Sequence, residues 1–153
     1  MKIAINTTPL TQIETDLLVV AVTDDNKAER LAALDAAFDG QLIATLNEDK
    51  FKAKAGASAS YPTFGTISAS RLVVVGLGDG DNAGLQQAAG KAGTLARERG
   101  AASVAVSLGD LDDTQTQLAI ESFVAGTYRF DKYKAEDDRK TDVNQLTLVG
   151  SAS

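Results

Sequence analysis

The sequence predicts an α/β protein in which a sheet lies between two layers of helices, a three-layer α/β/α sandwich. Residues 16–22 (DLLVVAV) and 71–77 (RLVVVGL) are continuous apolar runs, the pattern of strands that are covered on both faces. Segments with helical spacing of apolar residues separate the predicted strands, which is typical of this class. The chain of 153 residues, 44% of them hydrophobic, fits one domain of ordinary size. The pattern does not predict the order of the strands.

The first half of the chain begins with alternating residues that predict a short strand at Lys2–Asn6. After the run at 16–22, Asn26 and Glu29 have the spacing of a capping box and predict the start of a helix. Its predicted apolar face consists of Leu31, Leu34 and Phe38, up to an interruption at Gly40. The remaining elements predicted here are a short helix containing residues 42–46 and ending near residue 48, a loop or edge segment at 51–56 and a strand at 58–63.

The second half is predicted to continue from the strand at 71–77 through a turn to a long helix that ends at Gly100. Its predicted buried face consists of Leu85, Ala88, Ala89, Ala92, Leu95 and Ala96. Gly90 and Gly93 each weaken this helix by roughly 1 kcal/mol relative to Ala. We expect close approach of the helix to the sheet to compensate for this cost.

The last part of the chain is predicted to contain a strand at 103–108, a helix, a polar loop at 135–142 and a final strand at Gln145–Val149. Asp112 and Gln115 have the spacing of a capping box at the start of the helix. The predicted buried face of the helix consists of Ile120, Phe123, Val124 and Thr127.

The composition excludes several kinds of site. The chain has no Cys and no His, so it lacks disulfides, thiolates and the commonest general base and metal ligand. Its formal net charge is −6 and it has no dense basic patch, which argues against nucleic-acid binding. The start of the chain lacks the apolar segment of a signal peptide, and no apolar run is long enough to span a bilayer. We therefore expect a cytoplasmic protein.

The loop at residues 76–80 (GLGDG) is the first candidate for a ligand site, because it follows a strand and precedes a helix as phosphate-binding loops do. It is not a dinucleotide fingerprint, since Asp81 stands where the third glycine is needed, and no Gly-Lys-Ser/Thr of a P-loop follows. The acidic Asp79 and Asp81 would also repel a phosphate. We predict an ordinary strand-to-helix turn. A stand-alone module that binds ADP-ribose or a related nucleotide is the alternative.

Three acidic clusters are candidates for metal ligation, because hydrolases bind metals with carboxylates. They are Asp24 with Asp25, Asp110 with Asp112 and Asp113, and Glu136 with Asp137 and Asp138. The first two lie at predicted helix starts, where carboxylates cap free N–H groups, and the third lies in a predicted loop. We predict no catalytic, cofactor-binding or metal-binding residue in the chain.

Residues 128–134 (YRFDKYK) concentrate three of the eight aromatic residues, Tyr128, Phe130 and Tyr133. A hydrophobic clasp that closes the end of a helix would account for them. The segment also resembles a motif of the leucine aminopeptidase (cytosol aminopeptidase) family. Residues 14–20 (ETDLLVV), 51–56 (FKAKAG) and 71–78 (RLVVVGLG) resemble stretches of that family's N-terminal domain, in the same order.

The resemblance implies a macro-domain-like fold with a mixed sheet, and a longer parent enzyme. The parent would be a cytoplasmic, hexameric exopeptidase that releases N-terminal amino acids with the help of two Zn or Mn ions. In this family the metal ligands and catalytic residues lie in a C-terminal domain, so none can be assigned here. We expect residues 1–150 to form a non-catalytic N-terminal domain and residues 151–153 to begin the linker to an absent catalytic domain. The domain would assist assembly or substrate access, with Phe130 and Tyr133 as the candidate interdomain contacts.

Overall fold

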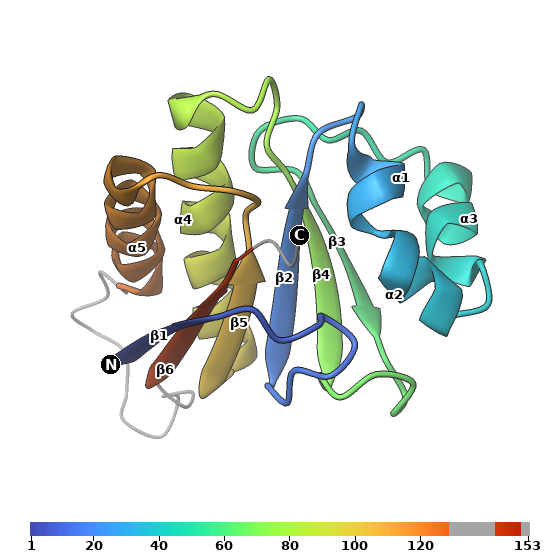
Figure 1. Ribbon diagram of the computed structural model, residues 1–153, viewed down its shortest axis with the longest axis horizontal. Helices are drawn as coiled ribbons and strands as arrows, with labels where there is room; N and C mark the ends of the chain where they lie inside the picture. Colours follow the sequence, from blue (N-terminus) through green and yellow to red (C-terminus); the bar gives the residue numbers. More distant parts are fainter. Residues whose placement is uncertain (129–142, 151–153) are drawn as a thin grey trace.

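Within residues 1–128 and 143–150, which the computed structural model describes, six strands form one mixed sheet in the order β1-β6-β5-β2-β4-β3 (Figure 1). The strands are β1 (Lys2–Asn6), β2 (Leu17–Val22), β3 (Ser58–Pro62), β4 (Arg71–Gly76), β5 (Ser103–Ser107) and β6 (Gln145–Val149). The helices are α1 (Lys27–Arg30), α2 (Ala32–Ala37), α3 (Gln41–Glu48), α4 (Asn82–Arg99) and α5 (Asp113–Thr127). Neighbouring strands are parallel except for β3, which runs antiparallel to β4. The predicted α/β class and mixed sheet are confirmed.

Helices cover both faces of the sheet, with α4 and α5 on one face and α1, α2 and α3 on the other (Figure 1). The side chains of β2 alternate between two cores. Leu17, Val19 and Ala21 join the core beneath α4 and α5, and Leu18, Val20 and Val22 join the core on the opposite face. Each of the six is at most 1% exposed. Because full burial of a Val or Leu side chain contributes about 1.5–3 kcal/mol, this strand is a major source of stability.

The two outer strands of the sheet differ in how they are shielded. On β3, the Tyr61 hydroxyl donates a hydrogen bond to Asp49 just after α3 (3.2 Å). Burial, and then this contact with the Asp49 carboxylate, raise the pKa of Tyr61 to about 12. At the other edge, β1 pairs with β6 and all five of its residues are exposed. The sheet is therefore open along β1.

The helix predicted after Asn26 is present but divided, and its predicted capping box is wrong. The Asn26 Oδ1 accepts a hydrogen bond from the Thr23 amide (2.7 Å), and the Thr23 hydroxyl accepts one from the Asn26 amide (3.2 Å). The Asn26 side chain therefore closes a turn with Thr23 and does not cap the helix. The helix divides at Leu31 into α1 and α2. Leu31 and Leu34 are buried as predicted, whereas Phe38 is half-buried.

The ends of α4 and α5 agree with the sequence predictions. The Asp112 Oδ1 accepts from the Gln115 amide (2.7 Å) and the Gln115 Oε1 accepts from the Asp112 amide (3.2 Å), which completes the capping box of α5. Gly100 adopts a φ of 65° after α4, and its amide donates to the Arg97 carbonyl (3.1 Å). This left-handed conformation favours glycine at the end of a helix.

The predicted buried faces of these two helices are confirmed in part. On α4, Leu95 is only half-buried, whereas the other five predicted residues are buried. On α5, Phe123 is buried as predicted, but its buried neighbours are Ala119 and Ser122. Ile120, Val124 and Thr127 are half-buried instead. The contact face of α5 is thus built from smaller side chains than the apolar pattern predicts.

Small residues let the backbones of α4 and α5 touch where the helices cross. A Cβ atom on Gly93 would lie 2.2 Å from the Phe123 carbonyl oxygen, and one on Gly126 would lie 2.2 Å from the Gly90 carbonyl oxygen. The Thr94 hydroxyl donates to the Gly126 carbonyl across the same contact (3.4 Å). The prediction that the α4 glycines allow close approach to the sheet is therefore wrong, because the neighbouring backbone belongs to α5.

The predicted loop at 135–142 lies outside the described residues, as does the motif at 128–134 apart from Tyr128. The predicted final strand is confirmed as β6. Among helices in the part of the chain that the structure describes, none is long and apolar enough to cross a bilayer.

Gly93 and Gly90 offer a matched test of the helix contact. Gly93→Ala should lower the free energy of unfolding by about 1–3 kcal/mol, because the new methyl group meets a carbonyl oxygen. Gly90→Ala should raise it by up to about 1 kcal/mol, since Ala favours the helix. The nearest atom to a Cβ at Gly90 lies 3.7 Å away, which is ordinary contact. Urea unfolding followed by circular dichroism measures the free energy of unfolding of both variants. If the two substitutions changed it in the same direction, close contact with α5 would not explain Gly93.

Candidate functional site

The carboxyl ends of the parallel strands form the edge at which open α/β sheets usually bind their ligands. Three features of this chain gather at that edge. They are the 76–80 loop after β4, Asp24 shortly after β2, and Arg30 at the end of α1. Their hydrogen bonds decide whether the edge can accept a ligand.

The 76–80 loop uses its amides within the chain. The Gly76 amide donates to the Ala57 carbonyl (2.8 Å), and the Gly78 amide donates to the Ala53 carbonyl (2.9 Å). Two further amides of the loop donate to backbone carbonyls as well: Leu77 to Val22 (2.8 Å) and Gly80 to Leu77 (3.1 Å). A phosphate-binding loop needs such amides free to donate to the ligand. The arrangement fits the predicted strand-to-helix turn and does not support the alternative of nucleotide binding.

Close packing explains the first glycine of this loop. A Cβ on Gly76 would lie 2.1 Å from the Lys54 carbonyl oxygen. The segment around Lys54 is also held by Asp24, whose Oδ1 accepts from the Ala53 amide (2.9 Å). The loop at 51–56 therefore packs directly on the end of β4, and the space a ligand would need there is occupied by backbone.

Arg30 closes the gap between the ends of β2 and β5. Its Nε donates to the Ala21 carbonyl (2.7 Å), and its Nη2 donates to both the carbonyl and the hydroxyl of Ser107 (3.0 Å each). Burial lowers the pKa of Arg30, while the charges of Asp110 and Glu29 act in the opposite direction. The guanidinium group thus satisfies backbone carbonyls at the strand ends. The sequence does not predict this role of Arg30, because nothing in the surrounding pattern distinguishes it from a solvated Arg.

The two acidic clusters in the described part of the chain do not join into a group that could hold a metal ion. No group of three or more Asp, Glu, His or Cys residues in 1–128 or 143–150 could hold a metal ion. Asp112 caps α5, as predicted, and Asp24 binds the loop amide described above. The cluster at 136–138 lies outside the described residues. The acidic residues of the described ranges therefore do not fit the two-metal centre that the family resemblance implies for the parent enzyme.

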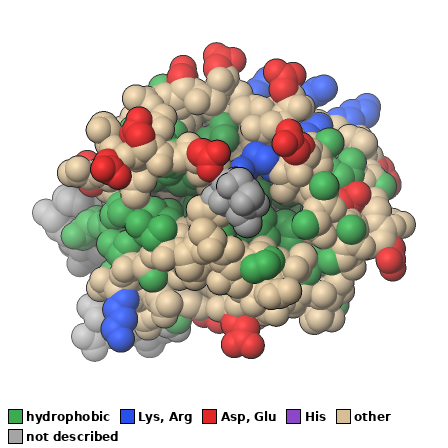
Figure 2. Space-filling view, viewed as in Figure 1, with side chains coloured by type: hydrophobic (Ala, Val, Ile, Leu, Met, Phe, Trp, Pro, Cys, Tyr) green, Lys and Arg blue, Asp and Glu red, His purple; other side chains and the backbone are tan. Residues whose placement is uncertain are grey.

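An exposed apolar surface lies along β1 and α5, and we call Met1, Ile3, Ile5 and Tyr128 the β1–α5 surface. Ile3 and Ile5 pair with Leu146 and Leu148, which belong to the core beneath α4 and α5. Because paired residues of neighbouring strands share a face, Ile3 and Ile5 lie on the same face of the sheet as this core. Both side chains are nevertheless exposed to solvent. Hydrophobic side chains gather on this side of the molecule in Figure 2.

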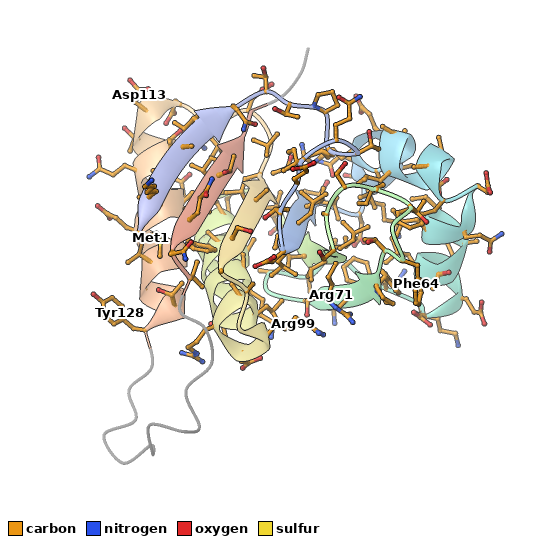
Figure 3. All side chains as sticks on the ribbon, turned by 90° about the horizontal axis from the view of Figure 1, so that it is seen from below. Met1, Phe64, Arg71, Arg99, Asp113 and Tyr128 are labelled. Atoms are coloured by element: carbon orange, nitrogen blue, oxygen red, sulfur yellow. The ribbon has the colours of Figure 1, made fainter. Side chains whose placement is uncertain are left out.

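Two members of the β1–α5 surface are particularly open to solvent. Ile5 is 65% exposed and Tyr128 is 74% exposed. Ile5 also borders a hollow of about 100 Å³ that Leu108 and Leu111 help to line. Met1 and Tyr128 lie on one side of the molecule, whereas the exposed Phe64 lies on the opposite side (Figure 3). The predicted contact residues Phe130 and Tyr133 lie outside the described residues, shortly after Tyr128.

A comparison with protein families identifies the chain. Residues 19–137 match the model described as "Cytosol aminopeptidase family, N-terminal domain". This chain belongs to the cytosol aminopeptidase family. The match confirms the family predicted from the four sequence stretches, and it assigns the chain to the N-terminal domain of the family.

Relatives of this aminopeptidase-family domain are considerably longer. A probable cytosol aminopeptidase of Geotalea uraniireducens is 31% identical over 147 residues, covering 92% of this chain and 30% of the relative. A probable cytosol aminopeptidase of Geobacter sp. strain M21 is 33% identical over 156 residues, covering 97% of this chain and 32% of the relative. The chain thus spans about a third of the length of these relatives.

The fold of the domain is also similar to that of a solved enzyme. A mutant of tomato leucine aminopeptidase matches the whole chain with a TM-score of 0.79 and 22% identity, and the match covers 33% of that enzyme. This likeness supports the α/β architecture described above.

Replacing Arg30 tests its role in closing the sheet edge. Arg30→Met should lower the free energy of unfolding by about 2–3 kcal/mol, because it leaves the Ala21 and Ser107 carbonyls without a donor. The control is Lys52→Met, which removes a positive charge at an exposed position and should change stability by less than about 0.5 kcal/mol. Urea unfolding measures both variants. Equal effects of the two substitutions would contradict the structural role of Arg30.

Proposed function

We propose that this chain is a non-catalytic domain that assists the assembly of an aminopeptidase or the access of peptides to its active site. The observation that carries the proposal is the match of residues 19–137 to the N-terminal domain of the family. The relatives, about three times longer than the chain, are named as aminopeptidases. We propose accordingly that residues 1–150 form the domain and residues 151–153 lead toward a catalytic domain.

The parent protein in this proposal is a cytoplasmic metallopeptidase that releases N-terminal amino acids from peptides as a homo-hexamer. Its two metal ions, Zn or Mn, would be bound by residues outside this chain. The composition supports that division, since the chain has neither His nor Cys to ligate Zn. The name "cytosol aminopeptidase" of a Pseudomonas aeruginosa relative supports the proposed location.

The β1–α5 surface is the proposed region of contact with the rest of the enzyme. Apolar side chains exposed together on a soluble domain mark interaction surfaces more often than isolated ones do. The sheet edge along β1 also presents unpaired backbone groups that a neighbouring segment can bind. Phe130 and Tyr133, which follow Tyr128 closely in sequence, would extend the same contact.

The first test asks whether the chain has peptidase activity of its own. The purified 153-residue chain should not hydrolyse leucyl-p-nitroanilide above the uncatalysed rate, with or without added Zn²⁺ or Mn²⁺. A longer protein in which this chain is followed by the family's catalytic region should hydrolyse it, and a metal chelator should abolish the activity. Release of p-nitroaniline is followed by absorbance. Metal-dependent turnover by the short chain would disprove the non-catalytic role.

The second test addresses the proposed contact in the longer protein. Phe130→Ala with Tyr133→Ala, and separately Ile3→Thr with Ile5→Thr, should each weaken assembly by about 2 kcal/mol, the size typical of contact hot spots. Thr preserves the β-branched shape and the strand preference of Ile. The oligomeric state is measured by size-exclusion chromatography with light scattering across a dilution series.

Phe64→Ala is the matched control for these aromatic and apolar substitutions. Phe64 is 90% exposed and lies on the side of the molecule opposite Met1 and Tyr128 (Figure 3). Its removal should leave assembly and activity unchanged. If the Phe130/Tyr133 variant retained assembly, stability and activity like the control, these residues would not be contacts.

A further inference from the structure

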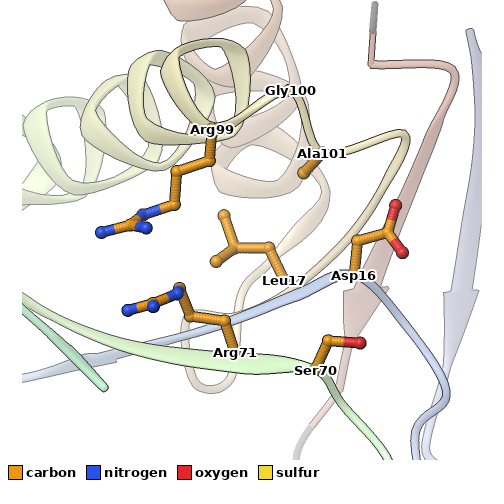
Figure 4. A pocket seen from close by; sticks show the side chains of 7 residues that line it. All are labelled: Asp16, Leu17, Ser70, Arg71, Arg99, Gly100 and Ala101. Carbon is orange, nitrogen blue, oxygen red and sulfur yellow. The ribbon is translucent and has the colours of Figure 1, made fainter. Parts of the chain in front are cut away.

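A hollow of about 290 Å³ lies at the other edge of the sheet, where β2 and β4 begin and α4 ends (Figure 4). Arg71, the first residue of β4, and Arg99, the last residue of α4, line it together. The floor of the hollow is formed by core residues, since Leu17 and Ala101 are only 1% and 6% exposed. The groups that the hollow offers to a ligand are therefore mainly the two cationic side chains.

The two guanidinium groups lie beside each other on one side of Leu17 (Figure 4). Burial, and then the positive charge of Arg99, lower the pKa of Arg71. Two like charges at short range repel each other, and an anion between them would relieve that repulsion. Arginine presents five N–H donors in a planar fork that matches the two oxygens of a carboxylate.

The one carboxylate among the described lining residues is turned away from the arginines. The Asp16 Oδ2 accepts hydrogen bonds from the Ala102 amide (2.9 Å) and the Ser103 amide (3.3 Å). Figure 4 shows its carboxylate directed away from both guanidinium groups. The Arg71 Nη1 donates to the Ser60 hydroxyl (2.9 Å), a neutral acceptor that leaves the charge uncompensated.

A purely structural role for Arg99 would be to stabilise the carboxyl end of the α4 dipole. That end already has backbone caps, however. The Gly100 amide donates to the Arg97 carbonyl (3.1 Å), and the Ala101 amide donates to the Ala96 carbonyl (3.0 Å). The helix dipole can account for Arg99, but it does not account for Arg71, which lies on β4.

We propose that this hollow binds the carboxylate of a small molecule, with the carboxylate between Arg71 and Arg99. A carboxylate is favoured over a phosphate because the adjoining hollow, about 400 Å³, is lined by Glu14 and Asp16. The negative charge of these residues repels a phosphate dianion more strongly than a carboxylate monoanion. This binding is independent of the proposed role in an aminopeptidase, since it uses only residues of this chain.

Titration of the ¹⁵N-labelled 153-residue chain tests the proposal by nuclear magnetic resonance. N-acetyl-leucine, which carries a carboxylate and an apolar side chain, should shift the amide signals of Leu17 and Ala101 with a Kd on the order of 1 mM. N-acetyl-leucinamide lacks the charge and should bind at least about tenfold more weakly. Acetate keeps the charge and should bind with a similar Kd.

Substitutions at the two arginines locate the site. Arg71→Gln and Arg99→Gln should each weaken N-acetyl-leucine binding about tenfold, the size expected for a lost charge-assisted hydrogen bond. Lys52→Gln is the matched control, because it removes the same charge at an exposed position outside the hollow. It should leave binding unchanged.

Several outcomes would overturn the proposal. They are equal binding of the acid and its amide, equal affinity in the arginine variants and the parent chain, or an equal loss in the Lys52 control. Tighter binding of inorganic phosphate than of N-acetyl-leucine would overturn the choice of a carboxylate. Thermal unfolding of each variant ensures that any loss is measured on folded protein, and Arg99→Gln, at an exposed position, serves if Arg71→Gln fails to fold.

Discussion

The burial of two adjacent strands, β2 and β4, on both of their faces is the constraint on which the rest of this structure depends. Every residue of β2 is at most 1% exposed, and residues 72–75 of β4 are fully buried. A strand without a solvated face needs a helix layer on each side and a hydrogen-bonded strand on each edge. The placement of α4 and α5 on one face and α1 to α3 on the other meets the first need. The neighbouring strands β5 and β3 meet the second.

Features that depend on local residues could be predicted from the sequence, and features that depend on distant partners could not. The apolar runs predicted β2 and β4, and Asp112 with Gln115 predicted the start of α5. The Asn26 capping box failed because Thr23 competes for the same side chain. Arg30 carries no local signal, since its acceptors include Ser107 on another strand. The guanidinium pair likewise arises only when the fold brings the end of α4 to the start of β4.

The two edges of the sheet have opposite characters, and this bears on what the domain can do. At the carboxyl edge, where α/β proteins usually bind ligands, loop amides, Asp24 and Arg30 are all engaged in holding the chain together. At the amino edge, Arg71 and Arg99 line one hollow. A domain whose carboxyl edge is filled by its own loops fits the supporting role proposed above. The candidate ligand-binding groups of this domain, Arg71 and Arg99, lie at the opposite edge of the sheet.

The pairing of β1 with β6 has a consequence for the order in which the chain can fold during synthesis. Lys2 pairs with Gln145, so β1, which precedes the other five strands of this sheet in the chain, cannot pair with β6 until β6 has been synthesised. The pairs β2–β5 and β2–β4 also join distant segments. Long-range parallel pairing of this kind slows folding and leaves strand edges exposed meanwhile. The alternating, partly polar sequence of β1 (KIAIN) would limit aggregation of this strand before β6 is available to pair with it.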